Sequence, residues 1–209
     1  MKLMEMLIEE GVIKIRKNDE EPFVINELGT KSRLFIDIKE ASLNPEILKE
    51  IKRKIFNKSE YTYNYGANIF NYDGDAYDNF FKKYDRIASV AIGGIPIATM
   101  LSISLGIPQI IIRSHKHDRG TQSQIIGNCE GKSCVLIEDV SVSGQSIVNA
   151  AKIIRNAGGI CDDCIVIVDR QEGAEKNCLD NNIRLFALLK KSDFGIDLEN
   201  VDQISSITA

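Results

Sequence analysis

The sequence predicts an α/β fold in which a central parallel sheet is flanked by helices. From residue 85 onward, short apolar runs that suit buried strands alternate with amphipathic helical patterns, and this alternation is typical of parallel βαβ units. The chain has 209 residues, of which 44% are hydrophobic and 27% are charged. A chain of this size and composition can bury a full core as a single domain, without disulfides or structural metal.

The first part of the chain predicts mixed local structure. Residues 2–10 suit a short amphipathic helix, and β-like runs follow at 22–25 and 33–38. Asn44-Pro45 then opens a helical pattern whose apolar face carries Ile47, Leu48, Ile51 and Ile55.

Residues 57–84 differ in composition from the rest of the chain. All six tyrosines fall between Tyr61 and Tyr84, among Asn, Asp and Gly residues. We interpret this stretch as a long surface excursion whose aromatic side chains anchor it on the core. A lid or a subunit contact is the alternative, because clustered Tyr is typical of interfaces.

The remaining elements follow in regular order. Strands are expected at 87–92, 109–112, 134–137, 164–168 and 185–189, with helices at 96–105, 146–156 and 171–181. Glycine or proline stands at several of the boundaries between these strands and helices. Ligands of such folds bind at the carboxyl ends of the strands.

Charge and composition exclude several classes of function. The net charge is −4, so no broad attraction to nucleic acid is expected. No apolar run approaches the ~20 residues of a membrane span, and residues 1–10 carry acidic groups where a signal peptide would be apolar. We therefore expect a cytoplasmic protein without a membrane partner.

The five cysteines do not suggest a disulfide framework, because their number is odd and nothing indicates secretion. Cys161 and Cys164 form a Cys-x-x-Cys pair, which supplies only two of the four ligands of a structural zinc site. Buried free thiols are the favoured interpretation, and no protein metal site is predicted.

The strongest functional signal is the segment Cys134–Ser146. Glu138 and Asp139 follow an apolar strand, and a small-residue turn then leads into a helix. Backbone N–H groups of residues 143–146 can cradle a phosphate, while the carboxylates can bind a sugar diol. The segment therefore predicts a ribose 5-phosphate site. An acidic strand end followed by a serine-capped helix is the alternative.

Three other segments carry polar or permissive residues. Gly93-Gly94 lie between a strand and a helix, where the main chain can approach a pyrophosphate, although a simple tight turn has the same pattern. Residues 113–121 hold five potential cations that suit a cover over a polyanion, or else a solvated basic loop. Arg170 ends a strand and can bind a carboxylate, or pair with Asp169 or Glu172.

These segments together resemble the type I phosphoribosyltransferases, and among them the orotate phosphoribosyltransferases. Cys134–Ser146 resembles the motif that binds 5-phosphoribosyl 1-pyrophosphate (PRPP), and Val168–Gly173 resembles an orotate-specific strand end. Residues 92–98 are similar to the pyrophosphate loop, 113–127 to the mobile catalytic loop, and 23–37 to the N-terminal hood.

The resemblance implies an organisation and an activity. Within one domain spanning 1–209, residues 1–43 would form a hood segment, residues 58–84 an insertion and residues 85–190 the PRPP-binding core. The implied reaction transfers ribose 5-phosphate from PRPP to orotate with Mg²⁺, giving orotidine 5′-phosphate and pyrophosphate. Family members are homodimers, so a homodimer is expected here.

The resemblance also implies roles for particular residues. The implied catalytic residues are Asp139, Glu138, Lys116 and His117. The implied PRPP-binding residues are Arg113, Arg119, Gly93, Gly94, Ser141, Val142, Ser143, Gly144, Gln145 and Ser146. The implied orotate-binding residues are Arg170 and Asn26.

The chain departs from the family pattern at several of these positions. Asn26 stands where a lysine is usual in the hood, Val142 where the PRPP motif has threonine, and Ser114 and His117 where the loop has lysines. Each lost polar contact is worth ~1–3 kcal/mol if nothing replaces it. Two alternatives therefore stay open: a phosphoribosyltransferase for another nucleobase, and a PRPP- or nucleotide-binding regulator without turnover.

Overall fold

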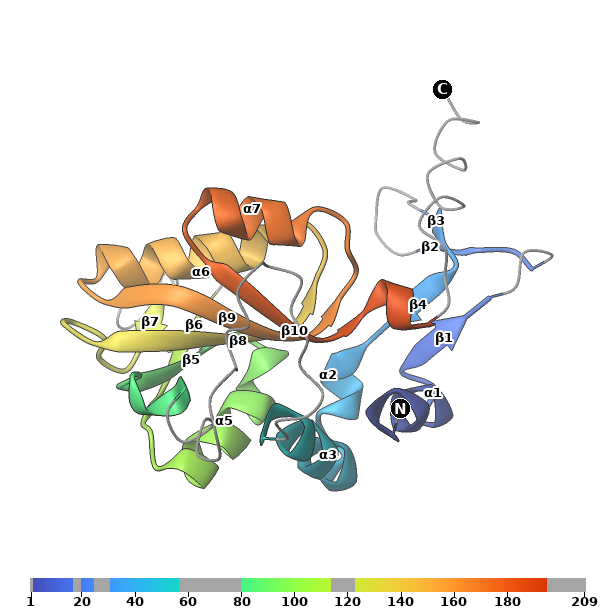
Figure 1. Cartoon of the computed structure of the whole chain (residues 1–209), viewed down its shortest axis with the longest axis horizontal. Coiled ribbons are helices and arrows are strands. Elements are labelled where there is room, and N and C mark those ends of the chain that lie inside the picture. The colour runs from blue at the N-terminus through green and yellow to red at the C-terminus, as the bar shows by residue number, and fades with distance from the viewer. Residues whose placement is uncertain (1, 17–19, 25–30, 57–79, 114–122, 195–209) are drawn as a thin grey trace.

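The computed structural model describes residues 2–16, 20–24, 31–56, 80–113 and 123–194. Its centre is a six-stranded sheet with the strand order β10-β9-β8-β5-β6-β7 (Figure 1). Neighbouring strands are parallel except β7, which runs antiparallel to β6. The strands are β5 (Arg86–Val90), β6 (Gln109–Ile112), β7 (Ile125–Ile126), β8 (Ser133–Ser141), β9 (Ile160–Asp169) and β10 (Arg184–Lys190). The predicted fold class is confirmed.

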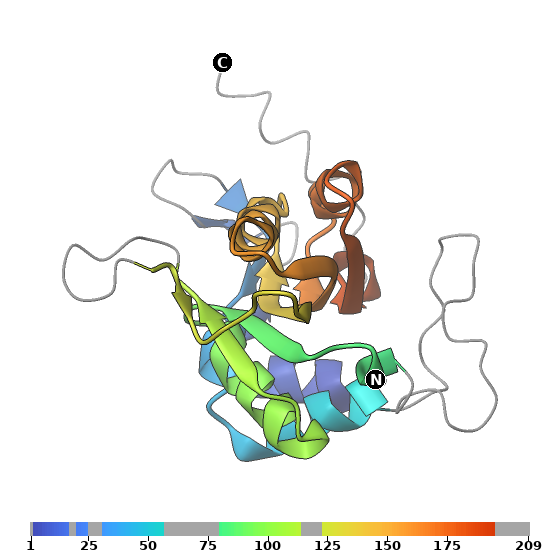
Figure 2. The same ribbon diagram turned by 90° about the vertical axis from the view of Figure 1, so that its left-hand side faces the viewer.

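Helices cover both faces of this sheet. Helices α6 (Gln145–Asn156) and α7 (Ala174–Asp180) lie on one face, and α5 (Gly94–Leu105) and α3 (Pro45–Phe56) lie on the other (Figures 1 and 2). Alternate residues of β8 divide between two cores, because successive strand side chains point to opposite faces. Val135 and Ile137 join the core with α3 and α5, whereas Cys134 and Leu136 join the core with α6.

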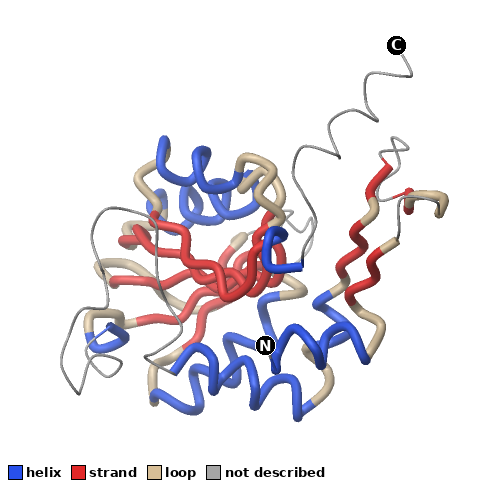
Figure 3. The backbone as a smooth tube through the Cα atoms, turned by 45° about the vertical axis from the view of Figure 1, so that its right-hand side comes forward, coloured by secondary structure: helices blue, strands red, loops and turns tan. Residues whose placement is uncertain are grey.

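The N-terminal segment adds two small antiparallel pairs, which stand apart from the central sheet (Figure 3). Its elements are α1 (Lys2–Glu9), β1 (Ile13–Ile15), β2 (Phe23–Val24), β3 (Lys31–Ser32), β4 (Leu34–Ile36) and α2 (Ile38–Ala41). Strand β1 pairs with β4, and β2 pairs with β3. Leu3, Leu7 and Leu34 are buried in the core that α3 and α5 share, so this segment packs on the sheet domain rather than forming a separate core.

Several predicted boundaries differ from the structure, and two of them lie at the candidate site. Strand β8 continues to Ser141 instead of ending before the carboxylates, because it pairs with β9 as far as Ser141 opposite Asp169. Helix α7 begins at Ala174, because Gln171 and Gly173 have positive φ angles of 56° and 100° that no helix accommodates. The short strands β1 and β7 and the one-turn helix α2 were not predicted from the sequence.

An aromatic cluster anchors the chain just before β5. The rings of Phe80, Phe81, Tyr84 and Phe186 contact one another with centroid separations of 5.0–6.4 Å. Residues 57–79, which hold most of the expected insertion, lie outside the described residues. The packing of residues 80–84 agrees with aromatic anchoring at the end of that segment.

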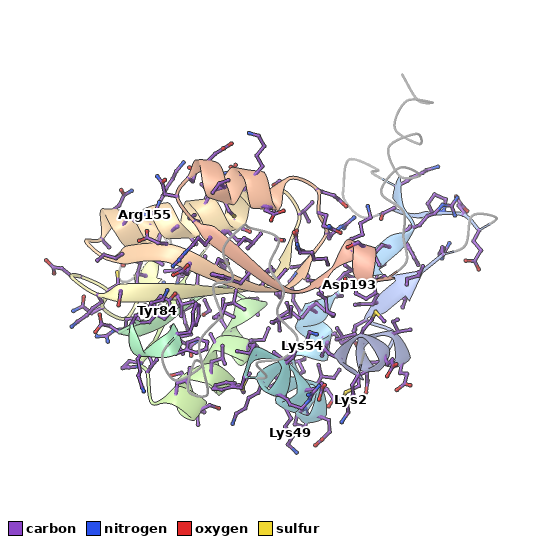
Figure 4. All side chains as sticks on the ribbon, viewed as in Figure 1. Lys2, Lys49, Lys54, Tyr84, Arg155 and Asp193 are labelled. Carbon is purple, nitrogen blue, oxygen red and sulfur yellow. The ribbon has the colours of Figure 1, made fainter. Side chains whose placement is uncertain are left out.

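A buried ionic cluster accompanies these rings at the amino end of β9. Lys83 and Arg184 donate to the carboxylate of Asp163 at 3.0 and 2.7 Å, and the hydroxyl of Tyr84, labelled in Figure 4, donates as well. Burial alone would raise the pKa of Asp163, but these hydrogen bonds outweigh it and hold the pKa below its ordinary value. None of the described helices combines the length and apolarity that a membrane crossing requires.

Candidate active site

The predicted glycines and carboxylates meet at the carboxyl ends of two neighbouring strands, β5 and β8. The chain builds the sheet outward from β5 through β6 and then returns to place β8 on the other side of β5. Such a reversal opens a crevice beyond the strand ends, which is where α/β sheets bind ligands.

Gly93 and Gly94 pack directly against the end of β8. A Cβ atom on Gly93 would lie 2.1 Å from Oδ2 of Asp139, and one on Gly94 would lie 2.4 Å from the carbonyl oxygen of Ile137. No side chain fits at either position, so glycine is required for the main chain to approach the carboxylate this closely. The structure thus brings the glycine turn and Asp139 into contact.

The two adjacent carboxyl groups are both buried. Glu138 is 5% exposed and Asp139 is 7% exposed, and Oε2 of Glu138 has no hydrogen-bond partner among the described residues. Burial, together with the adjacent Asp139 carboxylate, raises the pKa of Glu138 to about 9, against a smaller opposing effect of a hydrogen bond with Ser146. Glu138 is therefore protonated at neutral pH and can donate as well as accept a hydrogen bond.

The turn after β8 presents the amino end of helix α6. Gly144 is the N-cap with a φ angle of 73°, and no side chain caps the first turn. The serine cap considered as an alternative is therefore not made here. The N–H groups that begin α6 carry the partial positive charge of a helix N-terminus, an arrangement that suits a phosphate.

Helix α7 packs against this turn. The side-chain amide of Asn177 donates to the carbonyl oxygen of Ser143 at 2.8 Å. A Cβ atom on Gly144 would lie 3.0 Å from the carbonyl oxygen of Ala174, so the turn lies directly on the start of α7. The conformation of the turn is thus held by contacts outside the motif itself.

Several predicted phosphate-binding side chains have partners within the protein. The hydroxyl of Ser141 donates to Asp169 at 2.9 Å, and the amide of Gln145 donates to Asn149 at 2.8 Å. Val142 is 41% exposed and offers no polar group. The main-chain N–H groups, with the exposed Ser143 beside them, are therefore the donors that this turn offers to an anion.

Arg170 lies at the end of β9, where it is 7% exposed. Its Nε and Nη2 atoms lie 3.0 and 2.9 Å from Oε1 of Glu172, and Nη2 also lies 3.3 Å from Oγ of Ser32 in β3. The ion pair with Glu172 is present, whereas Asp169 accepts hydrogen bonds from Ser141 and from the N–H of Gln171. Arg170 thus ties the N-terminal strands to the carboxyl edge of the sheet.

The remaining predicted residues divide into two groups. Arg113 directly follows β6, and its N–H donates to the carbonyl oxygen of Gln124 at 2.8 Å. Asn26, Lys116, His117 and Arg119 lie outside the described residues.

Three residues near the site were missed by sequence reasoning. Ser32 contacts Arg170, and Lys191 lies beside Glu172. Asn177 donates to the turn at residues 141–146, which we call the phosphate turn after its predicted ligand. Ser32 is in a two-residue strand, and Asn177 and Lys191 occupy positions that read as solvent-facing. Only the three-dimensional arrangement identifies them.

The cysteines contribute no metal-binding cluster to the described part of the chain. All five thiols are buried and unpaired, and no group of three or more His, Cys, Asp or Glu side chains in the described residues is arranged to hold a metal ion. Burial raises the pKa of Cys134 and of Cys161 to about 12, so both stay protonated.

Comparisons with known proteins agree with this geometry. A family model for the phosphoribosyl transferase domain matches residues 40–182. The orotate phosphoribosyltransferase of Methanocaldococcus jannaschii is 36% identical over 190 residues, covering 90% of this chain and 92% of the relative.

Solved structures show the same fold. The crystal structure of orotate phosphoribosyltransferase from Aeropyrum pernix superimposes with a TM-score of 0.68 at 20% identity, covering 99% of both chains. The Mycobacterium tuberculosis orotate phosphoribosyltransferase in complex with PRPP gives a TM-score of 0.61 at 18% identity, covering 93% of this chain and 98% of the other. The chain belongs to the phosphoribosyl transferase domain family, and within it to the orotate phosphoribosyltransferases.

Proposed function

We propose that this protein transfers ribose 5-phosphate from PRPP to orotate, which yields orotidine 5′-phosphate and pyrophosphate. The observation that carries the proposal is the contact between Gly93-Gly94 and the buried Glu138–Asp139 pair, beside the uncapped start of α6. This arrangement suits a sugar that carries a phosphate at one end and a pyrophosphate at the other. The family of the chain supplies the identity of the base.

The pocket would bind the ribose phosphate through two kinds of group. Main-chain N–H groups of residues 143–146 would hold the 5-phosphate, while Glu138 and Asp139 would bind the two ribose hydroxyls. A protonated Glu138 beside the carboxyl group of Asp139 provides a donor and acceptors for a diol.

In the reaction the bond between C1 of the ribose and the pyrophosphate oxygen breaks, a bond between C1 and a base nitrogen forms, and that nitrogen gives up its proton to the pyrophosphate or to solvent. The electron pair of the broken bond leaves with the pyrophosphate, so negative charge develops on that group. Main-chain N–H groups of Gly93 and Gly94, together with Arg113, would stabilise this charge. Lys116, His117 and Arg119 would join them if the segment that holds them closes over the site.

The base would lie toward the N-terminal strands. Arg170 directly follows β9, its N–H donates to the carbonyl oxygen of Ser141, and its guanidinium contacts Ser32 of the hood segment. A guanidinium recognises a planar carboxylate through paired hydrogen bonds, and orotate carries such a group. The expected contact from Asn26 would add a neutral hydrogen bond.

The residues present fit a magnesium ion that arrives with the substrate. Mg²⁺ usually keeps several waters and binds through one or two carboxylates plus substrate phosphates. Asp139 would offer one carboxyl group, and Oε2 of Glu138, which has no partner in the described part of the chain, would add a second ligand once the ion displaces the Glu138 proton. Held there with the pyrophosphate oxygens, the ion would neutralise charge on the leaving group.

Orotate consumption tests the function directly. Purified protein with orotate, PRPP and Mg²⁺ should lose the orotate absorbance while releasing one pyrophosphate per orotate, and EDTA should stop the loss. Asp139→Asn should lower kcat/KM by roughly 10- to 100-fold, because it removes a charged acceptor. Near-normal turnover of Asp139→Asn would exclude the assigned role of this carboxylate.

A panel of other bases tests the principal alternative. The departures at Asn26 and Val142 favour examining uracil and purines under the same conditions. Turnover of another base without turnover of orotate would support a different phosphoribosyltransferase. PRPP binding without any product would support a regulator.

We also infer a cytoplasmic homodimer from family membership. Light scattering coupled to size exclusion would measure the mass of the assembly against the 23.3 kDa of one chain. A monomer that retains full activity would contradict this inference.

A further inference from the structure

Lys191 is a buried lysine at the edge of the candidate active site. It opens the short 3-10 helix η2 (Lys191–Phe194), which follows β10 directly, and it is only 2% exposed. Its Nζ atom lies 3.9 Å from Oε1 of Glu172, the same oxygen that Nη2 of Arg170 contacts at 2.9 Å. Two cations therefore share one carboxylate oxygen.

Hydrogen bonds hold the helix that carries Lys191 in place. The N–H of Ser192 donates to Oε1 of Gln171 at 2.8 Å, which joins η2 to the turn after β9. The N–H of Lys190 donates to Oδ2 of Asp193 at 2.8 Å, and Figure 4 labels Asp193 at this end of β10. The residues on either side of Lys191 thus each donate a main-chain hydrogen bond, and these bonds fix the position of Lys191 relative to Glu172.

The charges of this cluster are incompletely matched. Among the described residues, Glu172 is the only ionic partner of Lys191, and 3.9 Å exceeds the length of a hydrogen bond. The nearby buried carboxylate of Asp169 accepts instead from Ser141 and from the N–H of Gln171. Within the described residues no side-chain oxygen lies within hydrogen-bond distance of this ammonium, so an anionic ligand would supply the acceptor that these residues do not.

The location of the cluster identifies the part of the substrate that would supply this anion. The N–H of Arg170 donates to the carbonyl oxygen of Ser141 at 3.0 Å, at the start of the phosphate turn, and its side chain contacts Ser32. The cluster thus lies between the turn that would hold the sugar phosphate and the N-terminal strands. A base attached to that sugar would extend toward Arg170 and Lys191.

We propose that Lys191 is a specificity-determining residue that binds the carboxylate of the base together with Arg170, and that Glu172 is a positioning residue for both cations. The proposal rests on the proposed function and goes further by assigning the second cation. In this proposal Lys191 on η2 supplies the positive charge that the hood lacks because it has Asn26 at the position of a lysine. The ligand class is a base with a carboxylate substituent.

Binding of two nucleotides tests the proposal. Orotidine 5′-phosphate and uridine 5′-phosphate differ only in the base carboxylate, so the ratio of their dissociation constants reports its recognition. Lys191→Met should weaken orotidine 5′-phosphate binding by roughly 10- to 100-fold, the range for a hydrogen bond to a charged group, and change uridine 5′-phosphate binding less than twofold. Titration calorimetry measures both.

Lys190→Met is the matched control. Lys190 is the preceding residue and has no ion pair in the described part of the chain, so its variant should keep the wild-type ratio. Uridine 5′-phosphate binding serves as an internal control, because loss of folded protein affects both nucleotides equally. Lys191→Gln replaces the Met variant if that variant lacks a cooperative melt.

The outcomes separate this proposal from the proposed function. Wild-type preference for orotidine 5′-phosphate that is unchanged in both Lys191 variants would overturn the role of Lys191 while leaving the transferase intact. No wild-type preference, combined with no orotate turnover, would mean that the proposed function itself is wrong. Glu172→Gln should raise KM for orotate while leaving KM for PRPP unchanged, and an equal change in both would reject its positioning role.

Discussion

Replacing Glu138 with glutamine should change how the stability of the free protein depends on pH. Burial and the neighbouring Asp139 carboxylate raise the pKa of Glu138 from 4.5 to about 9. Between these values the folded protein holds a proton that the unfolded chain has released. The free energy of unfolding therefore falls as pH rises through this window. Glu138→Gln cannot ionise, so this fall should disappear.

The size of this fall in the free energy of unfolding follows from the pH range between the two pKa values of Glu138. A group protonated in the folded state and ionised in the unfolded state costs about 1.4 kcal/mol of stability per pH unit, or ~4 kcal/mol between pH 5 and pH 8. The loss is large compared with the 5–15 kcal/mol that stabilises a typical domain. Glu138→Gln should thus match the wild type near pH 5 and exceed it at pH 8.

Urea unfolding without PRPP at several pH values between 5 and 8 measures this difference. Glu9→Gln is a suitable control, because Glu9 is exposed on α1 and its variant should follow the wild-type pH dependence. Equal slopes of stability against pH for the wild type and Glu138→Gln would refute the reasoning, since Glu138 would then be ionised in the folded protein.

Three further predictions test the supports of the site. Gly93→Ala should lower kcat/KM for PRPP by roughly 10- to 100-fold in the orotate assay, because the added methyl would lie 2.1 Å from Oδ2 of Asp139; an unchanged value would place PRPP elsewhere. Asn177→Ala should raise KM for PRPP by about 2- to 10-fold, since the carbonyl oxygen of Ser143 loses its donor; an equal rise for orotate would argue against a local effect. Asp163→Asn should lower the free energy of unfolding in urea by about 1–3 kcal/mol, because the buried hydroxyl of Tyr84 and the half-exposed Lys83 and Arg184 lose a charged acceptor; an unchanged free energy of unfolding would contradict this.

The sequence predicted the sheet and the centre of the site because their signals are local. Apolar runs of strand length mark β5, β6, β8, β9 and β10, and the polar and glycine residues of the candidate site lie at the carboxyl ends of two of them. Gly93-Gly94 and Glu138–Asp139 are adjacent pairs at strand ends, so knowledge of parallel topology is enough to bring them together.

What the sequence did not predict depends on packing between distant elements. Ser32 and Arg170 are 138 positions apart, and neither residue type suggests the other. Asn177 acts on the phosphate turn through a main-chain carbonyl oxygen, which leaves no pattern of residue types. The raised pKa of Glu138 likewise depends on how completely the fold buries it, and periodicity does not report that quantity.

The departures from the family pattern fall into two physical classes. In the turn at residues 141–146, Gln145 donates to Asn149 and Val142 offers no polar group, so main-chain N–H groups, which no side-chain substitution removes, would hold an anion with the exposed Ser143 beside them. What that turn requires is the positive φ of Gly144, and the chain retains it. A hood position that contributes a charge is different, because only another cation can replace a lost one. Changes within the turn are therefore compatible with PRPP binding by themselves, whereas recognition of an acidic base with Asn26 in the hood requires a compensating cation, which the proposal assigns to Lys191.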